Sequence, residues 1–260
     1  MTHDTRFTGK TALITGGTSG MGLAVARRLL AEGASVVITG RDQARLDSAV
    51  KELGGDRVLA VRADVTSLSD LDALTETVRE RHGHLDVLFA NAGIAVFGPA
   101  AQTTEDEFDR AVNVNFKGVY FSIQKALPLL TTDAAIVINA SWTLHRGLPV
   151  GSVYSATKAA VQSLTRTLAA ELGPEGIRVN SVSPGYIDTP MYRDAVPADE
   201  ADAIRAQIAS GRIGTAEEVA DVVAFLASAD AAYVNGQDLI VDGGLVAAVA
   251  GPSRLDMAVA

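Results

Sequence analysis

The sequence predicts an α/β protein built on a doubly wound parallel sheet of about seven strands, with helices on both faces. Two observations carry this prediction. Short runs of continuous apolar residues alternate with segments of helical period along most of the chain. Strands that are apolar throughout are typical of a parallel sheet that is buried on both faces, and right-handed crossovers are expected between them. No Pro/Ser-rich linker or internal repeat divides the chain, so one domain is expected over residues 1–260.

The predicted strands are bounded by turn signals. The first one is TALIT, and the sequence GGTSGMG and an apolar helical segment follow it directly. A long Ala-rich helix is predicted from about residue 153 to 172, because Gly173-Pro174 is a strong stop signal. The segment 186–212 is the least regular, and it is interpreted either as a mobile flap over a site or as a solvated loop and helix. The seven predicted strands are residues 11–15, 35–39, 58–61, 85–89, 135–139, 177–182 and 238–241.

Composition and charge exclude several classes of function. With 31 Asp+Glu against 22 Lys+Arg, the net charge is −9, and no basic field is available to gather nucleic acid or anionic lipid. The chain contains no cysteine, which removes disulfides, thiolate nucleophiles and Cys-ligated metals. The polar N-terminal decapeptide and the absence of a bilayer-length apolar run lead us to expect a cytoplasmic protein without nucleic-acid or membrane partners.

The glycine cluster after the first strand predicts a dinucleotide site. Gly16, Gly20 and Gly22 have the spacing G-x3-G-x-G at the start of a helix. Glycines there let main-chain N–H groups approach a pyrophosphate, which also meets the helix N-terminus. A structural turn without a ligand is the alternative, but the position in the first βα turn favours the dinucleotide.

The end of the second strand bears on which dinucleotide is bound. A carboxylate there usually selects NAD(H), whereas a nearby arginine accommodates a 2′-phosphate. This chain has Gly40 and then Arg41, which favours NADP(H) over NAD(H) on charge complementarity. Two alternatives stay open: Arg41 could pair with Asp42 or Asp47 on the surface, and an Asp42 turned inward would favour NAD(H).

Tyr154, Lys158 and Ser141 are the candidate catalytic residues. Tyr154 and Lys158 stand four apart in a predicted helix, so they share one face. An ammonium held near a phenol would lower the phenol pKa from about 10 and fit it for proton transfer to a carbonyl oxygen. Ser141 follows an apolar strand, at the edge where ligands of such sheets bind. The alternatives are an exposed helix face with an extended lysine, and a serine that only caps a turn.

With these motifs in order, the sequence resembles the short-chain dehydrogenase/reductase family, in its single-domain branch of about 250 residues, which has a Rossmann-type fold. The resemblance extends from Lys10 to Gly244. The matching motifs are TGGTSGMG at 15–22, DV at 64–65, NAG at 91–93, Asn115 within NVNFKG, Ser141, YSATK at 154–158, PGYIDTP at 184–190 and DGG at 242–244.

The resemblance implies a role for each matching residue. Tyr154 would be the general acid/base, Lys158 would lower its pKa and hold the nicotinamide ribose, Ser141 would polarise the substrate oxygen, and Asn115 would anchor a water. Ser19 departs from the pattern, because NADP(H)-using members often carry a basic residue there. The implied cofactor-binding residues are Gly16, Thr18, Ser19, Gly20, Met21, Gly22, Arg41, Asp64, Val65, Asn91, Ala92, Gly93, Tyr154, Lys158, Pro184, Gly185, Ile187 and Thr189.

The resemblance also implies a mostly apolar substrate pocket, suited to a hydrophobic ketone or secondary alcohol. No arginine is evidently aimed at a substrate carboxylate, and Arg146 and Arg193 are the alternatives that could meet one. No metal site is expected, since His82 and His84 flank Gly83 without an evident third ligand. The implied pocket residues are Trp142, His145, Val150, Tyr186, Met191 and Tyr192, together with Val96, Phe97, Leu144 and Pro149; each has core or loop packing as its alternative.

The sequence therefore predicts an NADP(H)-dependent carbonyl reductase or secondary-alcohol dehydrogenase acting on a small molecule. An NAD(H)-dependent alcohol dehydrogenase of the same fold is the alternative, and a non-catalytic dinucleotide-binding regulator is a third interpretation. A homotetramer is expected from the family and from the Ala-rich helix after Tyr154 and the apolar stretch 245–251.

Overall fold

The computed structural model describes residues 5–251, so the ends of the predicted 1–260 domain, residues 1–4 and 252–260, lie outside the described residues. Seven parallel strands form one sheet in the order β3-β2-β1-β4-β5-β6-β9. This confirms the predicted doubly wound sheet; the longest extension is at β5, which begins at Leu130 rather than at residue 135. The strands are β1 (Thr11–Thr15), β2 (Ser35–Gly40), β3 (Val58–Arg62), β4 (Leu85–Ala90), β5 (Leu130–Asn139), β6 (Arg178–Pro184) and β9 (Asp238–Val241).

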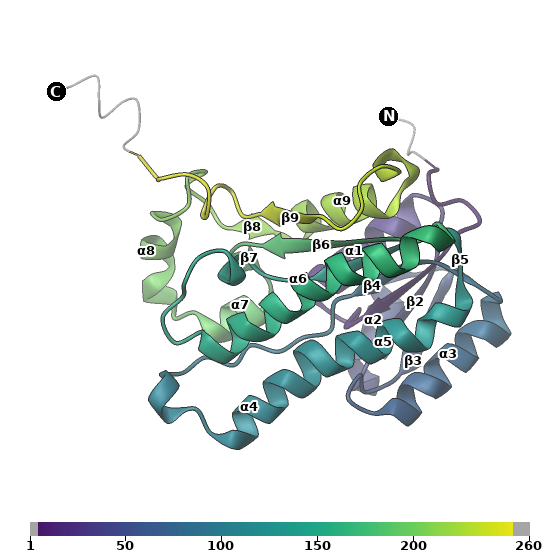
Figure 1. The fold of residues 1–260 in the computed structure, drawn as a ribbon, viewed down its shortest axis with the longest axis horizontal. Helices are drawn as coiled ribbons and strands as arrows, with labels where there is room; N and C mark the ends of the chain where they lie inside the picture. The colour runs from purple at the N-terminus through teal and green to yellow at the C-terminus, as the bar shows by residue number, and fades with distance from the viewer. Residues whose placement is uncertain (1–4, 252–260) are drawn as a thin grey trace.

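Helices cover both faces of the sheet (Figure 1). Helices α1 (Gly20–Ala31), α2 (Gln43–Leu53) and α9 (Ala216–Ala227) pack on one face. Helices α3 (Leu68–His82), α5 (Val119–Ala126) and α6 (Ser152–Leu172) pack on the other. Two apolar layers therefore enclose the strands, which explains why the strands are apolar on both sides.

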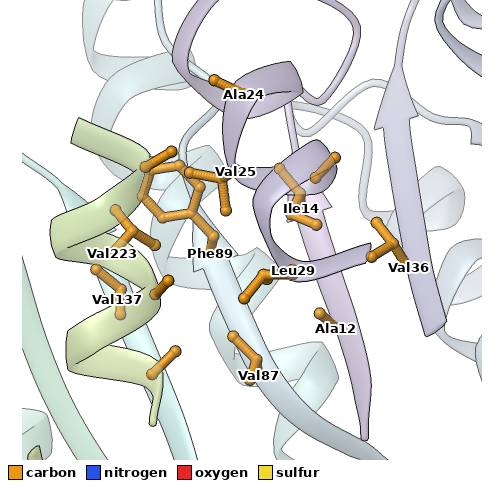
Figure 2. Close-up of a cluster of buried hydrophobic side chains, with 14 of the residues drawn as sticks. Ala12, Ile14, Ala24, Val25, Leu29, Val36, Val87, Phe89, Val137 and Val223 are labelled. Atoms are coloured by element: carbon orange, nitrogen blue, oxygen red, sulfur yellow. The ribbon is translucent and has the colours of Figure 1, made fainter. Parts of the chain in front are cut away.

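The core between α1, α9 and the sheet is formed by interlocking aliphatic side chains around one aromatic ring. Figure 2 shows Val25 and Leu29 of α1 and Val223 of α9 around Phe89 of β4, and all four side chains are buried. Val25 and Leu29 are four residues apart, so they lie on the same face of α1. This packing fixes α1, and with it the glycine turn that precedes the helix.

The strand order reverses between β1 and β4, in the middle of the sheet. From β1 the chain proceeds outward to β2 and β3, whereas β4, β5, β6 and β9 follow on the other side. The loops that leave β1 and β4 therefore diverge, and a crevice opens between them at the carboxyl edge, where ligands of open α/β sheets bind.

The segment 186–212 contains helices, in keeping with the loop-and-helix interpretation, and also one strand of a short strand pair that the sequence did not predict. A second sheet pairs β7 (Ile187–Asp188) with β8 (Gly214–Thr215), and α7 (Pro190–Ala195) and α8 (Ala201–Arg205) lie between them. Strands of two residues are too short to show a period, so a pattern search misses them. Beyond the ends of β6 and β9 (Figure 1), α8 adds Ile204 to a small apolar cluster with Trp142, Ile208 and Leu245.

The connection between β4 and α5 is helical with an irregular turn. Helix α4 (Glu105–Val112) begins with a capping box between Thr104 and Glu107. It continues into a π-helical turn, Asn113–Gly118, before α5. π-Helical turns are rare in proteins, and those that do occur are often found at functional sites. Short 3-10 helices occupy Ala100–Gln102, Leu127–Leu129, Trp142–Leu144, Gly173–Glu175, Ala198–Glu200 and Ala229–Ala231. Among residues 5–251, no helix is both long enough and apolar enough to cross a bilayer.

Phe89 should carry a large share of the stability of the core. Replacing Phe89 with alanine is expected to lower the free energy of unfolding by about 3–5 kcal/mol, because the change leaves a cavity between α1, α9 and β4. Chemical denaturation followed by circular dichroism measures the difference. Tyr233→Ala is the control, since the Tyr233 side chain is fully exposed. A loss below about 1 kcal/mol for Phe89→Ala would contradict this packing.

Candidate active site

One cavity of about 1170 Å³ opens at the carboxyl edge of the sheet. It extends from the glycine turn and the end of β2, past the ends of β4 and β5, to α6 and α7. All of the predicted cofactor residues line it, as do Ser141, Tyr154, Lys158, Trp142, Tyr186, Met191, Tyr192 and Phe97. The predicted residues Asn115, His145, Val150, Val96, Leu144 and Pro149 are not among its lining residues.

The glycine turn is built to approach an anion closely. Gly16 and Gly20 have φ values of +66° and +52°, in the left-handed region. A Cβ atom at Gly22 would lie 2.3 Å from the carbonyl oxygen of Gly16, so only glycine fits there. Ser19 forms no side-chain cap on α1, and the first turn of that helix has no acidic residue. The N–H groups and the positive end of the helix dipole therefore suit a pyrophosphate.

The end of β2 carries more positive than negative side chains. Arg41, Arg45 and Arg62 line the cavity there, against Asp42 and Asp64. The Asp42 carboxylate caps α2 by accepting a hydrogen bond from the Arg45 N–H at 3.1 Å. The nearest carboxylate oxygen to the Arg41 guanidinium is that of Asp64, 3.8 Å away, rather than that of Asp42 or Asp47. The Arg41 side chain is 65% exposed and faces this open end of the cavity.

A chain of hydrogen bonds joins α6 to the glycine turn. The Lys158 Nζ donates to the carbonyl oxygen of Asn139 at 2.8 Å. The Asn139 side chain donates to the Asn91 side chain at 2.9 Å, and Asn91 donates to the carbonyl oxygens of Thr15 and Gly16. Asn139 was not singled out as a site residue from the sequence. A polar residue that ends the apolar run AIVIN is the signal that could have found it.

Lys158 is buried beside this chain, and Tyr154 is partly buried there. Burial raises the pKa of Tyr154, and a hydrogen bond with Ser141 opposes that rise without cancelling it. Burial also lowers the pKa of Lys158 to about 8. The Lys158 Nζ lies 5.8 Å from the centre of the Tyr154 ring. The structure therefore gives the direction opposite to the expected fall in the phenol pKa, because burial raises it. At neutral pH the phenol keeps its proton.

Ser141 has its hydroxyl fixed by the turn that follows it. It is the N-cap of the 3-10 helix Trp142–Leu144, and its Oγ accepts hydrogen bonds from the Thr143 N–H at 3.3 Å and the Thr143 hydroxyl at 3.1 Å. With Thr143 as its donor, the Ser141 hydroxyl can donate its own proton to another oxygen. Ser141 therefore both caps the turn that follows it and lines the cavity. Thr143 was not singled out from the sequence.

Asn115 lies in the π-helical turn and is fully buried. Its side chain accepts from the Ile94 N–H at 2.8 Å and donates to the Ile94 carbonyl and to Thr157. These bonds tie the loop after β4 to α6. Because its amide oxygen and both amide hydrogens have protein partners, Asn115 supports the floor of the site from behind Gly93 and does not face the cavity.

The end of the cavity near α7 is walled by aromatic rings. Trp142 lies 5.1 Å from Tyr186, which lies 6.0 Å from Tyr192, measured between ring centres. Phe97 packs at 5.1 Å against Tyr154. The predicted arginines do not face this space: Arg146 donates to the carbonyl oxygen of Leu245, and Arg193 forms two hydrogen bonds with Asp188.

His145 and Val150 are corrections to the predicted substrate pocket. His145 turns away from the cavity and pairs with Asp238 at the start of β9, with 2.6 Å between Nε2 and Oδ2. Val150 has a φ of +63° and lines a separate cavity of about 250 Å³, together with Val96. Side-chain direction in this loop depends on distant partners, which a motif position does not reveal.

No group of three or more His, Asp or Glu side chains that could hold a metal occurs in the part of the chain that the structure describes. His84 instead lies 3.2 Å from Asp86, at the opposite edge of the sheet.

Comparison with known proteins identifies relatives along nearly the whole chain. A family model described as Enoyl-(Acyl carrier protein) reductase matches residues 16–246. The oxidoreductase asL5 of Sarocladium schorii is 42% identical over 92% of this chain and 97% of that protein. Meso-2,3-butanediol dehydrogenase of Serratia marcescens is 40% identical over 93% of this chain and 96% of that protein.

Solved structures agree with these relatives. A short-chain dehydrogenase/reductase described as glucose/ribitol dehydrogenase from Brucella melitensis superposes with a TM-score of 0.91 at 36% identity, over 94% of this chain and all of that one. A Burkholderia cenocepacia short-chain dehydrogenase in complex with NADP has a TM-score of 0.88 at 38% identity, over 92% of this chain and 99% of that one. A Brucella melitensis 3-ketoacyl-(acyl-carrier-protein) reductase complexed with NADH has a TM-score of 0.87 at 37% identity, with the same coverage.

Proposed function

Because the chain belongs to the short-chain dehydrogenase/reductase family and is therefore an NAD(P)-dependent oxidoreductase acting on CH–OH or C=O groups, we propose that residues 1–260 form a single domain that reduces hydrophobic ketones with NADPH. The reverse reaction is the oxidation of a secondary alcohol. One observation carries this proposal: the glycine turn and Tyr154 line the same cavity, so a dinucleotide bound at one end can present its nicotinamide at the other.

The protein side of the reaction is proton transfer and orientation. When bound, the nicotinamide supplies or accepts the hydride. The Tyr154 phenol, protonated at neutral pH, is placed to give its proton to the substrate oxygen as negative charge develops there. The Ser141 hydroxyl donates a hydrogen bond to the same oxygen. The Lys158 ammonium, fixed by Asn139, stabilises the phenolate that remains.

The walls of the cavity near Tyr154 favour an uncharged, hydrophobic substrate. Trp142, Tyr186 and Tyr192 supply aromatic surface there, and Lys158 is the cation among the described residues that line this end. Arg146 and Arg193 are bonded elsewhere and do not line it. A substrate carboxylate or phosphate would lose its hydration without gaining an arginine partner, which is unfavourable.

The preference for NADP(H) rests on the end of β2. The strand ends in Gly40 rather than in a carboxylate, and the Asp42 carboxylate, which also lines the cavity, caps α2. Three arginines face two aspartates around this end of the cavity, and the exposed Arg41 side chain is our candidate to bind a 2′-phosphate. The known complexes of relatives with NADP and with NADH leave NAD(H) use as the alternative.

Arg41→Ala tests the cofactor proposal. The variant should lose about tenfold or more in kcat/KM for NADPH, because a charge-assisted hydrogen bond to the phosphate is removed. Its kcat/KM for NADH should stay within about twofold, since NADH lacks the phosphate. Oxidation of both cofactors at saturating ketone measures the two values. An equal loss with both cofactors, or a wild-type preference for NADH, would overturn the NADP(H) proposal.

We also propose that the enzyme is a homotetramer. Phe108, Phe116 and Tyr120 are exposed along the helical stretch 105–126, and α6 presents the exposed alanines Ala156 and Ala159. Past β9, Val249 is exposed within the apolar stretch 245–251. Burying such patches against other copies would remove apolar surface from water. Light scattering at micromolar concentration should give the mass of four chains, and a monomer would contradict the proposal.

Tyr154→Phe tests the catalytic proposal. This variant should bind NADPH with nearly unchanged affinity but lose at least about a thousandfold in turnover, since the proton donor and its hydrogen bond with Ser141 are removed while the ring is kept. The substrate panel contains aryl ketones, cyclic ketones, diketones, β-keto esters and an enoyl thioester, the last because of the description of the matching family model. Tyr233→Phe is the control, because the Tyr233 side chain is fully exposed. Retained ketone reduction in Tyr154→Phe would overturn the role of the tyrosine.

The pH dependence of ketone reduction should follow Lys158. Below pH 8 the lysine is charged and the phenol is protonated, so kcat/KM should be level from about pH 6 to 7.5. Above that range kcat/KM should fall with an apparent pKa of about 8, as Lys158 loses its proton and the forming phenolate loses its counter-charge. Initial rates in buffers of constant ionic strength measure the profile. A rate that rises through pH 8 to 9 would contradict this assignment.

A further inference from the structure

His145 lies outside the cavity, yet it belongs to the segment that connects two of the proposed catalytic residues. Residues 142–150 run from Ser141 to the start of α6, which carries Tyr154. The His145 N–H donates to the carbonyl oxygen of Trp142 and closes the 3-10 helix that follows Ser141. The His145 ring points away from residues 142–150 and forms a hydrogen bond with the Asp238 carboxylate, with 2.6 Å between Nε2 and Oδ2. Because a carboxylate only accepts hydrogen bonds, the imidazole is the donor.

Asp238 is held rigidly in the sheet. It is the first residue of β9 and pairs in register with Ser181 of β6. Its side chain is only 6% exposed, and it accepts hydrogen bonds from the hydroxyls of Ser181 at 2.6 Å and Ser183 at 2.8 Å. Both serines are fully buried. The carboxylate is therefore a fixed point, and His145 is the donor that reaches it from outside the strands.

Two other hydrogen bonds join residues 142–150 to distant parts of the chain, and both have main-chain atoms as their partners. Arg146 donates to the carbonyl oxygen of Leu245, and the carbonyl oxygen of Val150 accepts from the Gly98 N–H. Neither tie involves a side chain anchored in the central sheet. Among the described residues, the His145–Asp238 hydrogen bond joins a side chain of residues 142–150 to a strand of the central sheet, whereas the chain just before Ser141 is joined to β6 by the main-chain bond from Ala140 to Val182. Trp142 and Thr143, which lie between Ser141 and His145 along the chain, line the cavity.

We propose that His145 is a positioning residue: its hydrogen bond to Asp238 holds the 142–145 turn so that Thr143 orients the Ser141 hydroxyl and Trp142 forms the wall of the substrate cavity. The inference rests on the proposed carbonyl reduction for its kinetic consequence, but the anchoring itself is a property of the protein alone. A small displacement of a group that touches the reacting oxygen is costly, because a shift of about 1 Å can reduce a rate by about a hundredfold.

Three substitutions of His145 separate this role from a general structural one. His145→Ala should lower kcat for ketone reduction by about tenfold or more. The Kd for NADPH should stay within about twofold, because the glycine turn and the end of β2 do not contact this segment. His145→Phe keeps a ring but no donor and should behave like His145→Ala. His145→Gln can place an amide N–H near Asp238 and should recover kcat to within about threefold of the wild type.

Trp142 provides a readout that needs no substrate. It is the single tryptophan of the chain, it is 6% exposed, and it lies three residues before His145. Acrylamide quenching of its fluorescence should increase about twofold in His145→Ala and His145→Phe but not in His145→Gln, because loss of the anchor lets quencher reach the indole. The stoichiometry of NADPH binding gives the fraction of folded molecules in each sample. The kcat is then calculated per folded molecule, so partial unfolding of a variant is not mistaken for a lower kcat.

His84→Ala is the matched control. His84 is also a histidine beside a carboxylate that is 6% exposed, that of Asp86, but it lies at the amino-terminal edge of the sheet, away from the cavity. This variant should leave both kcat and Trp142 quenching unchanged. An equal effect of His84→Ala and His145→Ala would show a general loss of stability and overturn the positioning role.

The outcomes distinguish this inference from the proposed function. If the wild type reduces no ketone, the proposed function fails, and Trp142 quenching in the His145 variants still decides whether the anchor exists. If the wild type is active and His145→Ala changes neither kcat per folded molecule nor Trp142 quenching, the inference fails while the proposed function stands. A change in only one of the two readouts also overturns it, because the proposal couples them.

Discussion

The site depends on one buried hydrogen-bonded chain, from Lys158 through Asn139 and Asn91 to Gly16. These residues come from α6 and from the ends of β5, β4 and β1, so the chain crosses the carboxyl edge of the sheet at the reversal of strand order. Each bond lies between groups that have little access to water, where an unpaired partner would be costly. These hydrogen bonds thereby tie the glycine turn, the proposed nucleotide end of the cavity, to Lys158 at its proposed catalytic end.

The burial of the Lys158 amine in this arrangement costs free energy. Burial disfavours the charged form of the amine and lowers its pKa to about 8, and burial also disfavours ionisation of Tyr154. A buried cation next to a partly buried phenol is unfavourable in a resting core, but it suits the proposed reaction, in which the phenol gives up a proton and needs a counter-charge. The π-helical turn around Asn115 and the left-handed backbone of Val150 are further departures from regular structure near the site.

The sequence predicted what local patterns determine. The strands, the glycine turn and the helix of Tyr154 and Lys158 each follow from apolar runs, glycine spacing or helical period within a few residues. The directions of side chains in loops could not be predicted from such local patterns. His145 was placed in the substrate pocket, but its partner Asp238 lies 93 positions later in the chain. The direction of the Tyr154 pKa shift was also missed, because burial is a tertiary property that the spacing of Tyr154 and Lys158 does not reveal. Strands β7 and β8 left no pattern to read, since each has two residues.

The central claim is that the dinucleotide and the substrate share one cavity, so that hydride passes directly between them. The most direct test uses NADPH with deuterium at C4 of the nicotinamide, prepared separately for each face of the ring, and locates the label in the alcohol product by NMR. The account predicts that one of the two labelled forms delivers its deuterium to the carbinol carbon and that the other delivers none, because a fixed cavity presents a single face. Product without label from either form, or with hydrogen from solvent at that carbon, would contradict it.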